Sequence, residues 1–246
     1  MPERLNSGSL GPTAILSNPP ANLHTPFDSL LQAYVRDGGV RYRAWAANAN
    51  NLTRLSKYIE ALEDLDPETW STTEALAFWI NLYNAATLKL VLNHYPLKSI
   101  REIGGEKESP WNRTVVAVAG ESLTLNQIEN DIIRPRFGEG RIHFALNCAA
   151  IGCPPLAAHA YTGHDLEAQL ETVTTATLAK PQWLTITADE IRVTKLFEWY
   201  EQDFVDDEGS LRDFLARYRQ EDREVLLDEA RKIVYMDYNW QLNEVN

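Results

Sequence analysis

The sequence is poor in the residues that cross-link a chain or anchor it in a membrane. Only two of the 246 residues are cysteines, which excludes a disulfide scaffold and leaves too few ligands for a structural zinc site. No apolar run reaches the roughly 18 residues of a transmembrane helix. The first 24 residues contain no apolar stretch typical of a signal peptide. These absences predict a soluble protein, cytoplasmic rather than exported, with a secreted or periplasmic form left open.

Positive charge is also scarce. Lys and Arg total 23 against 35 Asp and Glu, so the formal net charge is −12. An acidic field disfavours nucleic acid and anionic membrane surfaces, and the basic residues are scattered singly. No glycine-rich phosphate loop, dinucleotide fingerprint or H-E-x-x-H pair is present, so no cofactor and no metal are expected. The partner classes left are a small molecule, a peptide or another protein.

Elements can be read from the residue pattern. Residues 1–25 are rich in Pro, Asn, Ser and Gly and predict a loose or extended tail, followed by a single globular domain over 26–246. Helical spacing dominates the first part of that domain, whereas hairpin patterns occur at 114–125 and 182–196. Helices that lead and strands that cluster later predict an α+β fold with a small, mostly antiparallel sheet.

The segment 71–95 is the strongest predicted helix, and it is apolar almost all round, as a central buried helix would be. Ser71 and Glu74 have the spacing of a capping box. Glu74, Asn81 and Asn84 fall within about one quadrant of this helix at ~100° per residue. A polar quadrant in a buried helix is either hydrogen-bonded to loop backbone or lines a pocket, and both interpretations stay open.

The segment "RIHFALNCAAIGCPPL" (141–156) contains both cysteines. Alternation of apolar residues predicts a strand over 141–146, followed by a rigid loop. Cys148 is the candidate nucleophile and His143 its candidate base, although an extended chain would separate them by about 16 Å. His159 or His164 is an alternative base. A Cys148–Cys153 disulfide is a further possibility that requires an oxidising compartment.

Four motifs in order give the sequence a family resemblance: "EALAFWINLYNAATLKLV", "LTLNQIENDIIRPRF", "RIHFALNCAAIGCPPL" and the terminal "YNWQLN". Together they resemble the DUF547 family, a domain of unknown function, over about residues 70–205. Ala149–Ala150 departs from the serine- or glycine-containing motif of other members. The resemblance implies these motif positions: Glu74, Trp79, Asn81, Tyr83, Asn84, Glu129, His143, Asn147, Cys148 and Pro154.

A papain-like or transglutaminase-like arrangement is a further expectation, although here Thr and Glu occupy the start of the central helix, where such enzymes place the nucleophile. Two functional hypotheses follow. In the first, the protein is a thiol-dependent hydrolase or acyltransferase acting on an amide or thioester bond. Its catalytic residues would be Cys148, His143, Glu74 and Asn81, and its pocket-lining residues Asn84, Trp79, Asn147, Glu129 and Cys153. In the second, the same polar cluster only shapes a non-catalytic binding or scaffold module.

Overall fold

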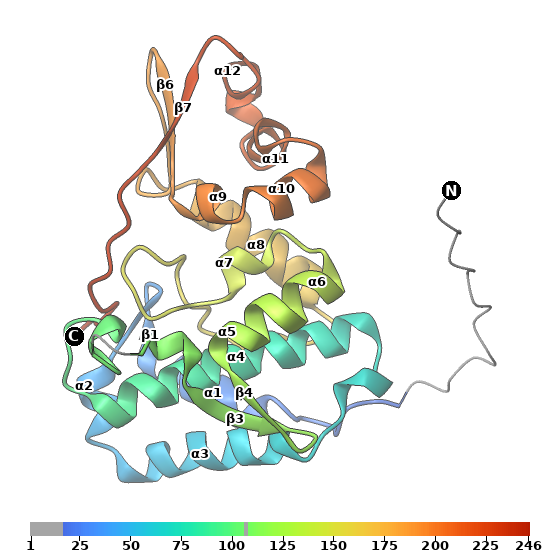
Figure 1. Cartoon of the computed structure of the whole chain (residues 1–246), viewed down its shortest axis with the longest axis vertical. Helices are drawn as coiled ribbons and strands as arrows, with labels where there is room; N and C mark the ends of the chain where they lie inside the picture. Colours follow the sequence, from blue (N-terminus) through green and yellow to red (C-terminus); the bar gives the residue numbers. More distant parts are fainter. Residues whose placement is uncertain (1–16, 106–107) are drawn as a thin grey trace, which may run out of the picture.

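The computed structural model describes residues 17–105 and 108–246, so the first 16 residues of the predicted tail lie outside the described part. Helices are the main element, and they are joined by short strands (Figure 1). The first group comprises α1 (Thr25–Tyr34), α2 (Tyr42–Ala46), α3 (Ala49–Glu63), η1 (Pro67–Thr69), α4 (Thr72–His94), η2 (Ile100–Glu102), η3 (Pro110–Asn112), α5 (Leu125–Gln127), the π-helix η4 (Ile128–Ile133) and α6 (Arg134–Phe137). The second group comprises α7 (Ile142–Ala145), α8 (Leu166–Leu178), α9 (Leu196–Trp199), α10 (Glu201–Glu208), α11 (Leu211–Tyr218), η5 (Gln220–Asp222) and α12 (Arg223–Leu226).

The strands form three small sheets, which confirms the α+β class. The strands are β1 (Val35–Arg36), β2 (Gly39–Val40), β3 (Thr114–Val118), β4 (Glu121–Thr124), β5 (Leu184–Ile186), β6 (Glu190–Val193) and β7 (Lys232–Tyr235). β1–β2, β3–β4 and β5–β6 are antiparallel pairs, whereas β7 lies parallel to β6. Both predicted hairpins are therefore present. Each hairpin pairs only neighbouring segments of the chain. Most residues of the apolar core lie in the helices.

Helix α4 is the centre of the molecule, as its sequence predicts. The Ser71 hydroxyl caps it by accepting from the Glu74 N–H at 3.3 Å, and the chain turns extended at Tyr95, before Pro96. Contrary to the expectation from the apolar runs, α4 is long and apolar enough to cross a membrane. Its most apolar window is 94% buried, so it is a core helix of this fold. In Figure 1 it lies between α3 and the α5–α7 segment.

Two apolar clusters lie on either side of α7, and the prediction of a single domain over 26–246 stays a prediction. Ile142 and Ala145 pack into the larger cluster around α4, whereas Phe144 packs into the smaller one with α10, α11 and the β5–β6–β7 sheet. The prediction of a strand over 141–146 is wrong. Both sides of this segment are buried, so the spacing of Ile142, Phe144 and Leu146 did not separate a core face from a solvent face.

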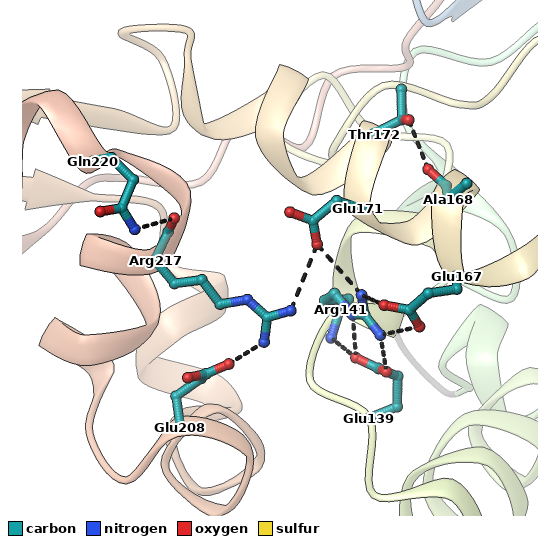
Figure 2. Close-up of polar contacts among 9 residues, drawn as sticks. All are labelled: Glu139, Arg141, Glu167, Ala168, Glu171, Thr172, Glu208, Arg217 and Gln220. Atoms are coloured by element: carbon teal, nitrogen blue, oxygen red, sulfur yellow. Dashed lines mark hydrogen bonds and ion pairs between the residues drawn. The ribbon is translucent and has the colours of Figure 1, made fainter.

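Arg141, directly before α7, fixes that short helix to α8. Its guanidinium bonds both oxygens of Glu139, at 2.8 and 2.6 Å, and both oxygens of Glu167 on α8, at 2.6 and 2.8 Å (Figure 2). Glu171, one turn further along α8, lies between Arg141 and Arg217 of α11 (Figure 2). These paired carboxylates make the burial of the Arg141 charge tolerable, and they hold α7 in one orientation.

After β7 the chain descends along the side of the molecule and ends beside α2 (Figure 1). On the way it hydrogen-bonds the loop that follows α7: Ile151 N–H to Gln241 O and Gly152 N–H to Asn239 O, both at 2.8 Å. A Cβ at Gly152 would lie 2.9 Å from the backbone nitrogen of Asn239, so only glycine fits this approach. The end of the chain thereby becomes one wall of the cavity described next.

Candidate functional site

A cavity of about 510 Å³ opens where α4, η4, α7 and the C-terminal segment meet. Its volume is typical of a small-molecule pocket. Aromatic side chains dominate the lining, together with both cysteines, one histidine and one carboxylate. The chemically informative lining residues are Tyr83, Trp111, Glu129, His143, Cys148, Cys153, Trp199, Tyr200, Tyr238 and Trp240.

The cysteine loop, residues 147–153, folds back so that its two cysteines meet. The Cys148 N–H donates to the Cys153 sulfur at 2.9 Å, and both cysteines are free thiols. Ala149 has a φ of 63°, a left-handed conformation that a residue with a side chain adopts only when its surroundings impose it. Asn147 imposes it in part: its Oδ1 accepts from the Ala149 N–H at 2.9 Å, and its Nδ2 donates to the Pro154 carbonyl at 2.8 Å.

The two thiols have opposite pKa shifts. A hydrogen bond to Cys153 and desolvation raise the pKa of Cys148 well above its ordinary value. Burial alone would raise the pKa of Cys153, but hydrogen bonds from the Cys148 thiol, the Tyr238 hydroxyl and main-chain N–H groups outweigh it and lower that pKa. The pair therefore loses one proton more readily than an isolated cysteine does.

Tyr238 covers the thiols from the C-terminal segment. Its hydroxyl lies 3.1 Å from the Cys148 sulfur, and its ring packs against Trp199 and Trp240 with centroid separations of 4.9 and 4.6 Å. Burial and the neighbouring thiols raise the pKa of Tyr238 well above its ordinary value. The phenol is thus protonated at neutral pH and can donate a hydrogen bond into the cavity.

His143 lies on the same cavity, but its partner is not a cysteine. Its Nε2 lies 2.7 Å from Oδ2 of Asp203 on α10, and the ring stacks on Tyr200 at a centroid distance of 3.9 Å. Arg134 holds Asp203 from the other side with two hydrogen bonds, at 2.6 and 2.9 Å. Burial would raise the pKa of Asp203, yet His143 and Arg134 together hold it well below its usual range. Among the described residues, no hydrogen bond joins His143 to either thiol.

Glu129 is a second acidic group on this cavity, and it is 8% exposed. It projects from the π-helix η4, a form of helix that is rare and frequent at functional sites. Its Oε2 accepts from the Tyr83 hydroxyl at 3.0 Å and its Oε1 from the Tyr200 hydroxyl at 2.6 Å. The residues that the structure describes give it no ion-pair partner.

The other sequence-predicted residues support the loops rather than face the thiols. Asn84 bridges α4 to the end of α7, donating to the Ala145 carbonyl and accepting from the Asn147 N–H, both at 2.9 Å. Asn81 makes the corresponding pair of bonds with the backbone of Tyr161, at 2.7 and 2.9 Å. The polar quadrant of α4 thus binds loop backbone at both asparagines, which is the simpler of the two interpretations of the sequence.

Glu74 and Trp79 lie away from the cysteine loop. Glu74 accepts from the Gly163 N–H at 3.3 Å and lines a different cavity, of about 1010 Å³, together with His159. Trp79 is 4% exposed, and its indole N–H has no hydrogen-bond partner. The structure therefore brings together Cys148, Cys153, His143 and Glu129, with Asn147 and Asn84 behind them, and leaves Glu74, Asn81 and Trp79 outside this cavity.

Sequence reasoning missed Asp203, Arg134, Tyr200 and Tyr238. Tyr200 and Asp203 belong to "EWYEQDF", where helical spacing of aromatic residues suggests a packing face and nothing more. The one usable signal in the sequence is that Asp203 directly precedes Phe204, an aromatic residue expected to be buried and found to be so. A carboxylate next to a buried position needs a polar partner. In the part of the chain that is described, no group of three or more His, Cys, Asp or Glu side chains is arranged to hold a metal ion.

Comparison with known proteins identifies the core of this site. No curated protein and no solved structure matches the chain. Residues 67–176 match the family model described as "Protein of unknown function, DUF547", a range that contains α4, η4, α7 and the cysteine loop. Asp203 and the C-terminal wall lie beyond the matched range. The resemblance to the DUF547 family is confirmed over residues 67–176.

Proposed function

We propose that the protein is a thiol-dependent hydrolase or acyltransferase that acts on an amide or thioester bond, with Cys148 as its nucleophile. The observation that carries this proposal is that one cavity is lined by a half-buried thiol, by a second thiol that accepts a hydrogen bond from the Cys148 main-chain N–H, and by a histidine paired with Asp203. Cys148 is the better nucleophile because Cys153 is only 6% exposed. Free cysteines also favour a reducing compartment such as the cytoplasm.

In this proposal Cys153 takes the proton that Cys148 loses. A substrate carbonyl carbon is attacked by the Cys148 sulfur, the thiol proton moves to the Cys153 thiolate, and the carbonyl electron pair moves to oxygen. When the tetrahedral intermediate collapses, the leaving amine or thiolate takes that proton from Cys153. The product is an acyl thioester on Cys148, which water cleaves in a hydrolase and a second nucleophile cleaves in an acyltransferase.

His143 and Tyr238 supply the remaining functions. His143, oriented by Asp203 through Nε2, is suited to take a proton from the water or acceptor that attacks the acyl thioester. The main-chain N–H groups of 148, 149, 151 and 152 all donate within the protein, so an oxyanion needs another donor. The Tyr238 hydroxyl, 3.1 Å from the nucleophile, becomes that donor once Cys153 has taken the thiol proton and the phenol hydrogen can turn to the oxyanion.

The test is the pH dependence of iodoacetamide labelling, read at each cysteine by peptide mass. We expect the thiol pair of the native protein to lose its first proton with an apparent pKa below that of an ordinary thiol, so that Cys148 is alkylated at pH 7. Cys153→Ala removes the proton acceptor and leaves Cys148 a single desolvated thiol, whose pKa lies above the apparent pKa of the pair. Each unit of increase in pKa reduces the thiolate about tenfold while raising its nucleophilicity about threefold, so labelling should slow at least threefold.

Two outcomes would contradict the proposal. Equal labelling of Cys148 at pH 7 in the native protein and in Cys153→Ala would remove Cys153 as the proton acceptor. A thiol that resists labelling until about pH 9 would leave the alternative of a non-catalytic module with a structural Cys/His/Asn cluster. Formation of an acyl adduct from a simple alkyl thioester, located on Cys148 by mass and absent from Cys148→Ala, tests the enzyme assignment directly.

A further inference from the structure

Aromatic rings form a large part of the cavity lining. Trp111, Trp199, Tyr238 and Trp240 form one contiguous group, with centroid separations of 5.6 Å for Trp111–Trp240 and 5.9 Å for Trp199–Trp240. Trp199 is 43% exposed, an unusual state for a large apolar side chain that packs against two others. Burial of a core does not require rings in this position, so the group calls for a ligand.

Behind the rings lies a carboxylate without a cationic partner. Glu129 accepts one phenol on each oxygen, and these bonds hold the negative charge at the cavity without neutralising it. Arg134 is engaged by Asp203 and forms no ion pair with Glu129. A buried anion of this kind is costly unless a positive charge approaches it. Among the described residues, no Lys or Arg side chain lines the cavity.

We propose that this cavity binds a quaternary ammonium group. The ring faces attract a cation through their quadrupoles, and Glu129 supplies the complementary charge. A primary ammonium would need several hydrogen-bond acceptors, whereas each Glu129 oxygen already accepts a phenol, so a methylated cation fits better. Arg101 shows the same preference on the neighbouring surface, with its guanidinium carbon 5.2 Å from the Trp240 ring centroid.

If the cation belongs to the substrate, the inference rests on the proposed function, because the acyl donor or acceptor that reaches Cys148 would carry the quaternary ammonium group. As a binding site, it does not require a reactive thiol. Cation binding is read on the native chain without any thiol reaction, so failure of thiol chemistry and failure of cation binding can be told apart.

The experiment is a ligand-observed NMR titration of the full chain with three probes: choline, its neutral carbon isostere 3,3-dimethylbutan-1-ol, and ethanolamine. We expect choline to bind at least about fivefold more tightly than either of the others. Glu129→Gln should bring choline and the neutral isostere within about twofold of each other. Trp199→Leu, at a position that is 43% exposed, should weaken choline binding about threefold.

Glu121→Gln is the matched control, because it removes one carboxylate from the exposed β4 strand and leaves the cavity intact. Its affinity for choline should equal that of the native chain, which separates a local site from general attraction to an acidic protein. Equal affinity for choline and the neutral isostere, tighter binding of ethanolamine, or an equal loss in Glu121→Gln and Glu129→Gln would each overturn the inference.

Discussion

Asn147→Ala should destabilise the protein far more than the loss of one ordinary surface amide. The Asn147 side chain, in a residue 4% exposed, makes three hydrogen bonds: from the Ala149 N–H at 2.9 Å, to the Pro154 carbonyl at 2.8 Å, and from the Asn243 amide at 3.2 Å. Each lost bond costs about 1 kcal/mol, and each partner left buried and unpaired costs about 1–3 kcal/mol.

Water from the adjoining cavity can reach part of the opened loop, so the lower part of this range applies. We expect a loss of about 3–5 kcal/mol in the free energy of unfolding, against a typical total of about 5–15 kcal/mol. The left-handed Ala149 also loses the contact that imposes its conformation. Cys153, whose pKa depends on this loop geometry, should then titrate closer to an ordinary thiol.

The assay is urea denaturation followed by tryptophan fluorescence, in which the midpoint should fall by about 1–2 M at an unchanged slope. Asn126→Ala is the control, since Asn126 is exposed and accepts one hydrogen bond, from Asn130 at 2.9 Å. It should cost under about 1 kcal/mol. An Asn147→Ala loss no larger than that of the control would show that other contacts hold the cysteine loop, and the reasoning would be refuted.

Three other perturbations test the supports of the site. Asp203 has a folded pKa below its unfolded value, so its contribution to stability is complete above about pH 4 and is lost as acid protonates it. Asp203→Asn should therefore make the free energy of unfolding fall less steeply between about pH 5 and pH 2. An unchanged dependence of stability on acid would contradict this. Gly152→Ala places a methyl group against Asn239 and Tyr238, and it should lower the free energy of unfolding in urea by about 1–3 kcal/mol. Because Tyr238 is pushed aside, iodoacetamide should also label Cys148 faster. Labelling at the native rate would show that the Tyr238 ring does not cover the thiol. Arg141→Met should lower the free energy of unfolding by about 2–4 kcal/mol in the same assay. The control is Arg113→Met, which breaks the exposed ion pair with Glu108 and should cost under about 1 kcal/mol. Similar losses for the two variants would show that the buried network does not stabilise the fold.

Helix α4 and its cap could be predicted because their signals are local. Ser71 and Glu74 lie within one turn, and the apolar run of α4 is long enough to exclude a strand. The Thr124–Gln127 capping box could be identified from sequence for the same reason, and it is present with both of its hydrogen bonds. Such features depend on residues three or four positions apart, a distance over which one sequence carries full information.

The segment 141–146 could not be assigned from the same kind of signal. Four residues make one helical turn, and Ile142, His143, Phe144 and Ala145 are all buried, so neither period is visible. The helical form is fixed by contacts with other elements. Arg141 binds Glu167 of α8, and the Asn84 amide donates to the Ala145 carbonyl. Tertiary contacts therefore determine the local conformation here.

The site residues also fall into two groups, those that sequence motifs predict and those that only tertiary contacts bring to the cavity. Cys148, His143 and Glu129 lie within the family motifs, and the structure gathers them at one cavity. Asp203 is 60 residues from His143, and Tyr238 is 90 residues from Cys148. Pairings over such separations leave no spacing pattern in one sequence, so the orienting carboxylate and the covering phenol came only from the fold.

The C-terminal segment has a consequence for the order of folding. Asn243 bonds Asn147 across 96 residues and Tyr42 across 201, so the C-terminal segment joins parts of the described chain that are far apart in sequence. Closing such long loops is slow compared with forming α4 or the hairpins. During synthesis, which proceeds from the N-terminus, the cysteines emerge long before Tyr238 does. Newly made chains thus pass through a stage with two uncovered thiols, and the finished arrangement forms in the last steps of maturation.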